Sequence, residues 1–144
     1  MTKNSAIIQA SVDILVQFYD LDPMNVVWHG HYLKYFEQAR CALLDQIDYN
    51  YFQMRDSGYI WPVVDVRLKY VKSAVFNQLV TVVASLVEYE NRLKIEYRVL
   101  DSQSHTVLTK GYTIQVAVDN NSQEMLYRSP DILFAKLGVS VGDA

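Results

Sequence analysis

The sequence contains one cysteine and no excess of basic residues. The first argues against a disulfide-bonded or zinc-binding protein, and the second against a nucleic-acid-binding protein. Cys41 has no partner for an internal disulfide, and the sequence has no Cys-x-x-Cys zinc pattern. Lys and Arg number 13 against 16 Asp and Glu, a net charge of −3, so no nucleic-acid partner is expected. The cysteine content fits a reducing compartment.

Long hydrophobic runs and a targeting segment are also missing. The apolar stretch 79–87 is interrupted by Thr81 and Ser85 and is too short to cross a bilayer. Residues 1–11 lack the basic start, apolar stretch and cleavage site of a secretory signal. We therefore expect a cytoplasmic protein without membrane insertion. Its 144 residues, 51% of them hydrophobic, predict a single globular domain over 1–144.

Two different hydrophobic periods predict strands and one long helix. Apolar and polar residues alternate, or valines dominate, in five segments that we expect to be strands: 8–18, 64–70, 79–89, 93–99 and 112–118. Apolar residues three and four apart over 30–47 predict a helix of roughly five turns. A short helix is expected after Pro130, ending at Gly138. The order predicts an α+β domain whose last four strands are antiparallel neighbours.

The residues best suited to chemistry lie between 18 and 40, where a loop leads into the long helix. Asp20 and Asp22 precede the helix, and His29 and His31 lie at its start. A carboxylate at this point is favoured by the helix dipole, and the free N–H groups of the first turn can stabilise an oxyanion. Such an arrangement suits acyl transfer. The two histidines are two residues apart, a poor spacing for a metal pair, so no metal is expected.

This segment resembles the hotdog-fold thioesterases of the 4-hydroxybenzoyl-CoA thioesterase and YbgC type. Their motif is Asp-x-Asp, a small-residue turn, Val-Val-Tyr/Trp-His-x-x-Tyr, and an aromatic-rich helix with Glu-x-Ala-Arg. The matching positions are Asp20, Asp22, Val26, Val27, Trp28, His29, Tyr32, Glu37, Ala39 and Arg40. The resemblance implies a hotdog fold, in which a curved antiparallel sheet of about five strands wraps around one long helix.

The resemblance also implies an activity and two catalytic residues. The catalytic aspartate of the family corresponds to Asp22, acting either as a nucleophile that forms an anhydride or as a base that activates water. The family's oxyanion donor corresponds to the main-chain N–H of His29, whose side chain is implicated as well. The implied reaction is hydrolysis of an acyl thioester of coenzyme A or of an acyl carrier protein. No cofactor is implied, because coenzyme A enters only as part of the substrate.

The same resemblance implies a shared site and a set of binding residues. Members of the family are homodimers or homotetramers with active sites at subunit interfaces. We expect Trp28, Tyr32 and Trp61 to line the acyl pocket, and Lys72 and Arg92 to bind the coenzyme A phosphates or the phosphopantetheine arm. The sequence departs from the family at Asn25, where glycine is usual. Asparagine tolerates a positive φ better than other non-glycine residues, so we expect the turn to be preserved.

Several residues and two other functions remain open as alternatives. Glu37 is either paired with Arg40, which we favour, or a helix carboxylate with a catalytic role. Cys41 is interpreted as a small buried hydrophobe rather than a nucleophile. A hotdog dehydratase is disfavoured, because its His-Phe-Pro type of stretch is absent. A non-catalytic module that binds acyl thioesters or acyl carriers is the remaining alternative.

Overall fold

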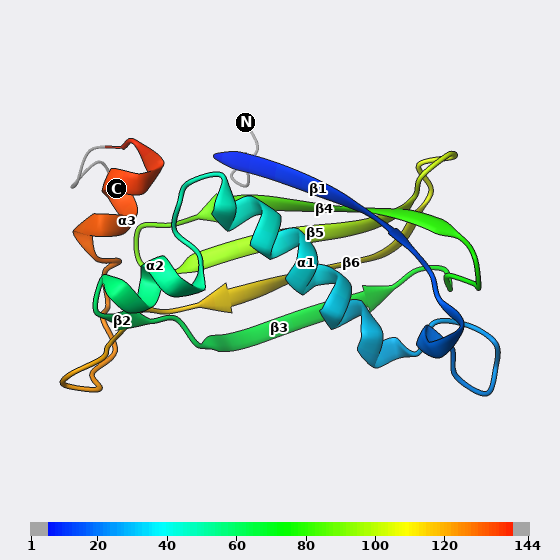
Figure 1. The fold of residues 1–144 in the computed structure, drawn as a ribbon, viewed down its shortest axis with the longest axis horizontal. Coiled ribbons are helices and arrows are strands. Elements are labelled where there is room, and N and C mark those ends of the chain that lie inside the picture. The colour runs from blue at the N-terminus through cyan, green and yellow to red at the C-terminus, as the bar shows by residue number, and fades with distance from the viewer. Residues whose placement is uncertain (1–5, 140–144) are drawn as a thin grey trace.

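The protein is a curved antiparallel sheet with one long helix lying diagonally across one face (Figure 1). The computed structural model describes residues 6–139. The α+β class and the hotdog arrangement are confirmed. The elements in chain order are β1 (Ile8–Leu15), the 3-10 turns η1 (Phe18–Asp20) and η2 (His29–His31), α1 (Tyr32–Asp45), α2 (Tyr51–Asp56), β2 (Tyr59–Ile60), β3 (Val63–Tyr70), β4 (Leu79–Glu88), β5 (Leu93–Asp101), β6 (Val107–Gln115), β7 (Val118–Asp119) and α3 (Asp131–Leu137).

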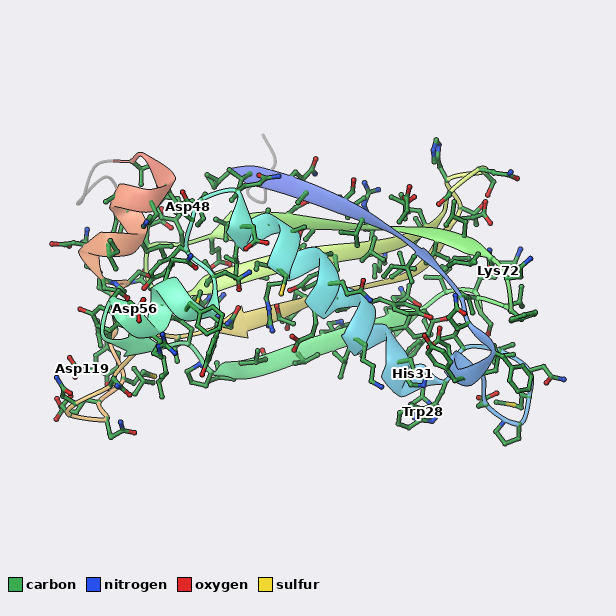
Figure 2. The ribbon with its side chains drawn as sticks, in the orientation of Figure 1. Trp28, His31, Asp48, Asp56, Lys72 and Asp119 are labelled. Carbon is green, nitrogen blue, oxygen red and sulfur yellow. The ribbon has the colours of Figure 1, made fainter. Side chains whose placement is uncertain are left out.

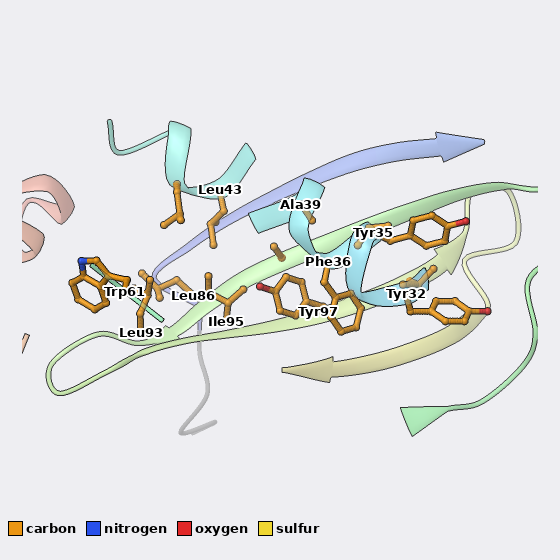
Figure 3. Close-up of a cluster of buried hydrophobic side chains, with 14 of the residues drawn as sticks. Tyr32, Tyr35, Phe36, Ala39, Leu43, Trp61, Leu86, Leu93, Ile95 and Tyr97 are labelled. Atoms are coloured by element: carbon orange, nitrogen blue, oxygen red, sulfur yellow. The ribbon is translucent and has the colours of Figure 1, made fainter. Parts of the chain in front are cut away.

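The core forms where the apolar stripe of α1 meets the concave face of the sheet (Figure 3). Phe36 of α1 stacks on Tyr97 of β5, with ring centroids 4.2 Å apart and planes 4° from parallel. Gly111 of β6 lies beneath this pair. A Cβ at Gly111 would clash with the carbonyl oxygen of Arg67 and lie 3.2 Å from the Phe36 ring. Glycine at this position therefore allows helix and sheet to approach closely.

The strand order differs from the one expected from the sequence. The sheet order is β1-β4-β5-β6-β3, so β3 pairs with β6 and is not a neighbour of β4. The connection 71–78 is too long for a tight hairpin and crosses the end of the sheet. Its backbone is held on the way, because Val71 N and Lys72 N both donate to Leu108 O, and Asn77 N donates to Val16 O. Long links of this kind allow strands consecutive in sequence to separate.

Element ends also differ from the sequence pattern. The predicted strand 112–118 begins earlier, at Val107, because a register irregularity opposite Val99 and Leu100 disturbs the alternation. It also ends earlier, at Gln115, and Val118 belongs to the separate short strand β7. The predicted strand 8–18 ends at Leu15, since 18–20 form η1. The helix after Pro130 is confirmed as α3, and Gly138 ends it with φ 73°. None of the helices within 6–139 has the length and apolarity needed to span a membrane.

Candidate active site

Asp22 lies in a tight turn between η1 and η2. Its main-chain N–H donates to Val26 O at 2.9 Å, and its carbonyl oxygen accepts from Asn25 N at 2.9 Å. The Asp22 Oδ1 atom accepts from Met24 N at 2.8 Å, the geometry of an Asx turn. Asn25 has φ 63°, so the turn adopts the left-handed conformation expected where the family has glycine. The turn fixes the carboxylate at the edge of the fold, partly exposed to solvent.

Asp20 anchors the same loop from its buried side. Its carboxylate is buried, and Oδ2 accepts from the Tyr35 hydroxyl at 3.0 Å and from Gln17 N at 2.9 Å. Its carbonyl oxygen accepts from Trp28 N at 2.9 Å. Burial, the Asp20 hydrogen bond and the nearby Asp20 charge raise the pKa of Tyr35, which therefore stays protonated as a donor. Asp20 thus has a structural role, since it ties both ends of the loop to α1.

The helical segment begins at His29, directly after this anchored loop. His31 N donates to Trp28 O at 2.9 Å, but the His29 N–H has no backbone acceptor within the part of the chain that the structure describes. Tyr70 at the end of β3 donates through its hydroxyl to His29 O at 2.8 Å. Tyr70 therefore fixes the peptide that follows His29, a contact that sequence reasoning missed. The alternating pattern of β3 could have identified Tyr70 as a residue on the helix side.

Asp22 and His29 line one small cavity at this end of the molecule. Its volume is about 140 Å³, and its walls are Asp22, Met24, Val26, Val27, His29, Tyr32, Tyr70, Lys72 and Ser73. Among side chains of residues 6–139, none donates to Asp22 Oδ2, so one carboxylate oxygen is available to a ligand. Of the predicted site residues, Asp22, His29, Tyr32 and Lys72 are brought together here. Residues that carry a carboxylate, an imidazole, a main-chain N–H without an acceptor and a cation line this space.

The remaining predicted site residues, Trp28, Arg92 and Trp61, do not line this cavity. The Trp28 ring packs over Gly30 between the rings of His29 and His31, at centroid distances of 5.0 and 5.5 Å, and does not line the cavity. Figure 2 shows Trp28, His31 and Lys72 at the same end of the molecule. Arg92 lies near the turn between β4 and β5, where its Nε is 2.9 Å from Glu88 Oε1.

Trp61 lines a second cavity, of about 390 Å³, between α1, α2 and β2. Its indole N–H donates to the Tyr49 hydroxyl at 3.2 Å, so the ring presents carbon to the cavity. Glu37 and Arg40 at the rim form the expected ion pair, at 2.8 Å. Cys41 at the same rim is exposed, so the interpretation of Cys41 as a buried hydrophobe is wrong.

Comparison with known proteins identifies the family. Residues 16–135 match the family described as the thioesterase-like superfamily. The chain belongs to the thioesterase-like superfamily. This thioesterase-like chain is 32% identical over 85 residues to the "Putative acyl-CoA thioesterase YneP" of Bacillus subtilis, a match covering 59% of this chain and 61% of that protein. It is 33% identical over 73 residues to a "Putative esterase" of Aquifex aeolicus, covering 51% and 57% respectively. The matched region thus spans about three fifths of these relatives.

Solved structures of other proteins show the same fold. A hypothetical protein of Thermus thermophilus superimposes with a TM-score of 0.78 and 28% identity, covering 90% of this chain and 97% of that one. The YbaW probable thioesterase of Escherichia coli gives a TM-score of 0.77 with 22% identity, covering 92% and 98%. At that identity the second likeness concerns the fold alone.

Proposed function

We propose that this thioesterase-like protein hydrolyses acyl thioesters of coenzyme A or of an acyl carrier protein, with Asp22 and His29 at its active site. The observation that supports this most is that both residues line one cavity, while Asp22 Oδ2 and the His29 N–H lack partners within the described chain. A carboxylate and an N–H group at a helix start are the two functions that acyl transfer needs.

Either of two routes fits this pair. In the first, Asp22 attacks the thioester carbonyl, the thiolate leaves, and water then cleaves the resulting anhydride. In the second, Asp22 takes a proton from water as that water attacks the carbonyl carbon. Both yield a free acid and a thiol. In both, the His29 N–H and the positive end of α1 stabilise the oxyanion, and the His29 imidazole can donate the proton that the leaving thiolate takes up.

We further infer that the site is completed by a second copy of the chain. β3 is an edge strand, and its Val64 and Val66 are 57% and 41% exposed. An unpaired strand edge that carries exposed valines is open to pairing with another strand. Antiparallel pairing of β3 with β3 of a second copy around a two-fold axis would cover it and extend the sheet. This pairing would bring Trp61 of one copy toward the Tyr70 and Lys72 end of the other, so that the cavity lined by Trp61 and the cavity lined by Asp22 come together.

The test is release of free acid, followed by mass spectrometry, from short-chain, long-chain and aromatic acyl-CoA and from one acyl carrier thioester. Asp22→Asn keeps the acceptor for Met24 N but loses the nucleophile and base, so we expect kcat to fall about 10²- to 10⁴-fold with little change in Tm. Asp56→Asn, an exposed site on α2, is the matched control and should keep full activity. Equal turnover by wild type and Asp22→Asn would refute the role of Asp22. Binding without turnover by wild type would favour the non-catalytic module.

A further inference from the structure

The sheet face turned away from α1 carries a row of three basic side chains. Tyr97 and Gly111 lie next to Phe36 of α1. Side chains alternate between the two faces of a sheet, so their neighbours in sequence, Arg98 and Lys110, lie on the opposite face. Lys110 is directly opposite Arg98 on one side and Lys69 on the other. The row therefore crosses three adjacent strands, β5, β6 and β3. With strands about 4.8 Å apart, it spans about 10 Å.

This row, which we call the cationic row (Lys69, Lys110, Arg98), is unfavourable for the isolated fold. Like charges directly opposite each other on neighbouring strands destabilise a sheet. None of the three forms an ion pair with any residue in the described range 6–139. They line a shallow hollow of about 460 Å³ whose other basic residues are Arg67 and Lys94 and whose one acidic residue is Glu96. An anionic partner would relieve this repulsion.

The row stands out because the protein as a whole is acidic. The net charge is −3, yet five basic residues gather at one hollow. An acidic partner would therefore be attracted toward this hollow.

We propose that the cationic row is the docking surface for the acidic surface of a carrier protein that presents the acyl thioester on a phosphopantetheine arm. The proposal rests on the proposed thioesterase function. The hollow is open and shallow, whereas small-molecule sites are concave and bury most of their ligand, so a protein surface fits better than a free nucleotide. Lys69 is three residues from Lys72, within about 11 Å, and Lys72 lines the Asp22 cavity. A partner docked on the row would thus hold its arm near the cavity.

The decisive variant is Lys110→Glu, at the centre of the row. It places a carboxylate directly opposite Lys69 and Arg98, so the sheet should gain stability and Tm should rise. Docking of an acidic carrier should weaken at the same time, which a merely structural role would not produce. Lys136→Glu makes the same charge change on α3, far along the chain from the row, and is the matched control.

The first measurement compares hydrolysis of octanoyl carrier protein, octanoyl-CoA and the octanoyl thioester of N-acetylcysteamine, which has no phosphate. For Lys110→Glu we expect KM for the carrier substrate to rise at least tenfold at low salt, with the N-acetylcysteamine substrate unchanged. The difference in KM for the carrier substrate between Lys110→Glu and wild type should shrink as salt is added. A loss confined to octanoyl-CoA would assign the row to the nucleotide and overturn the proposal, as would unchanged KM values for all three substrates.

The second measurement is direct binding of fluorescently labelled holo-carrier protein, read by anisotropy, and it does not require turnover. If wild type hydrolyses no thioester, the proposed function fails, but a tenfold weaker Kd for Lys110→Glu with an unchanged Kd for Lys136→Glu still supports docking. Equal binding by all three proteins would overturn it. Binding of a short DNA duplex as tightly as the carrier would also overturn it, since the row would then be a general polyanion surface.

Discussion

The hydroxyl of Tyr35 donates a 3.0 Å hydrogen bond to Oδ2 of Asp20, and both residues are buried. Through this bond the first turns of α1 hold the acidic loop, because Asp20 also accepts from Gln17 N and, through its carbonyl, from Trp28 N. The position of Asp22 thus depends on a residue thirteen positions away that does not line the cavity.

We expect Tyr35→Phe to destabilise the protein without removing a proposed catalytic group. The Asp20 carboxylate would keep Gln17 N but lose its buried donor, at a cost of about 1–3 kcal/mol. Urea unfolding measures this loss. Tyr51→Phe removes an exposed hydroxyl and serves as the control, with a change near zero. An unaltered unfolding midpoint for Tyr35→Phe would show that the bond contributes nothing to stability.

Tyr70→Phe should reduce kcat while leaving the fold intact. The Tyr70 hydroxyl fixes the His29 carbonyl at 2.8 Å and is exposed, so its loss costs little stability. If the His29 N–H stabilises the oxyanion, a less rigid peptide should weaken that effect by about 0.5–1.5 kcal/mol, up to roughly tenfold in kcat. Steady-state kinetics on an acyl-CoA, with Tm measured in parallel, separate the two effects. A change in KM alone would assign Tyr70 to substrate binding instead.

Asp101 should make stability depend on pH in the acid range. Its carboxylate accepts from Ser104 N, the Gln78 amide and Gln103 N, and these bonds lower its pKa from 3.8 to about 2. A lowered carboxylate pKa stabilises the fold above its unfolded pKa, and this contribution is lost as the pH falls toward 2. The difference in Tm between wild type and Asp101→Asn should therefore be largest near pH 6 and should decrease as the pH falls from 4 to 2. A constant difference would contradict this assignment.

Val66→Glu should break the proposed pairing of β3 with a second copy. Val66 is 41% exposed in the middle of the edge strand, and a charge there would disfavour pairing with β3 of a second copy. Light scattering after gel filtration should show a shift toward monomer, with acyl-CoA hydrolysis lost in parallel because the site would be incomplete. Tyr127→Glu, at an exposed loop position, should leave mass and activity unchanged. A monomeric wild type with full activity would rule out the shared site.

The sequence by itself determined the local elements and where the chemistry is concentrated. Alternation over 8–15 and the three-to-four spacing over 32–45 depend only on the geometry of each element, so β1 and α1 could be predicted. The turn at Asn25 could be predicted for the same reason, since a positive φ is a property of one residue and its neighbours. The segment from Asp20 to Arg40 identified the family through its order of residues.

Only the tertiary structure decided which distant residues meet. That β3 lies beside β6, that Trp61 lines a different cavity from Asp22, and that Tyr70 reaches His29 all depend on strand pairing across the fold. The cationic row exists only in this register, because Lys69, Arg98 and Lys110 are far apart in the sequence. Strand order is set by packing on α1 and by the path of long connections, and these interactions leave no mark in the local hydrophobic pattern.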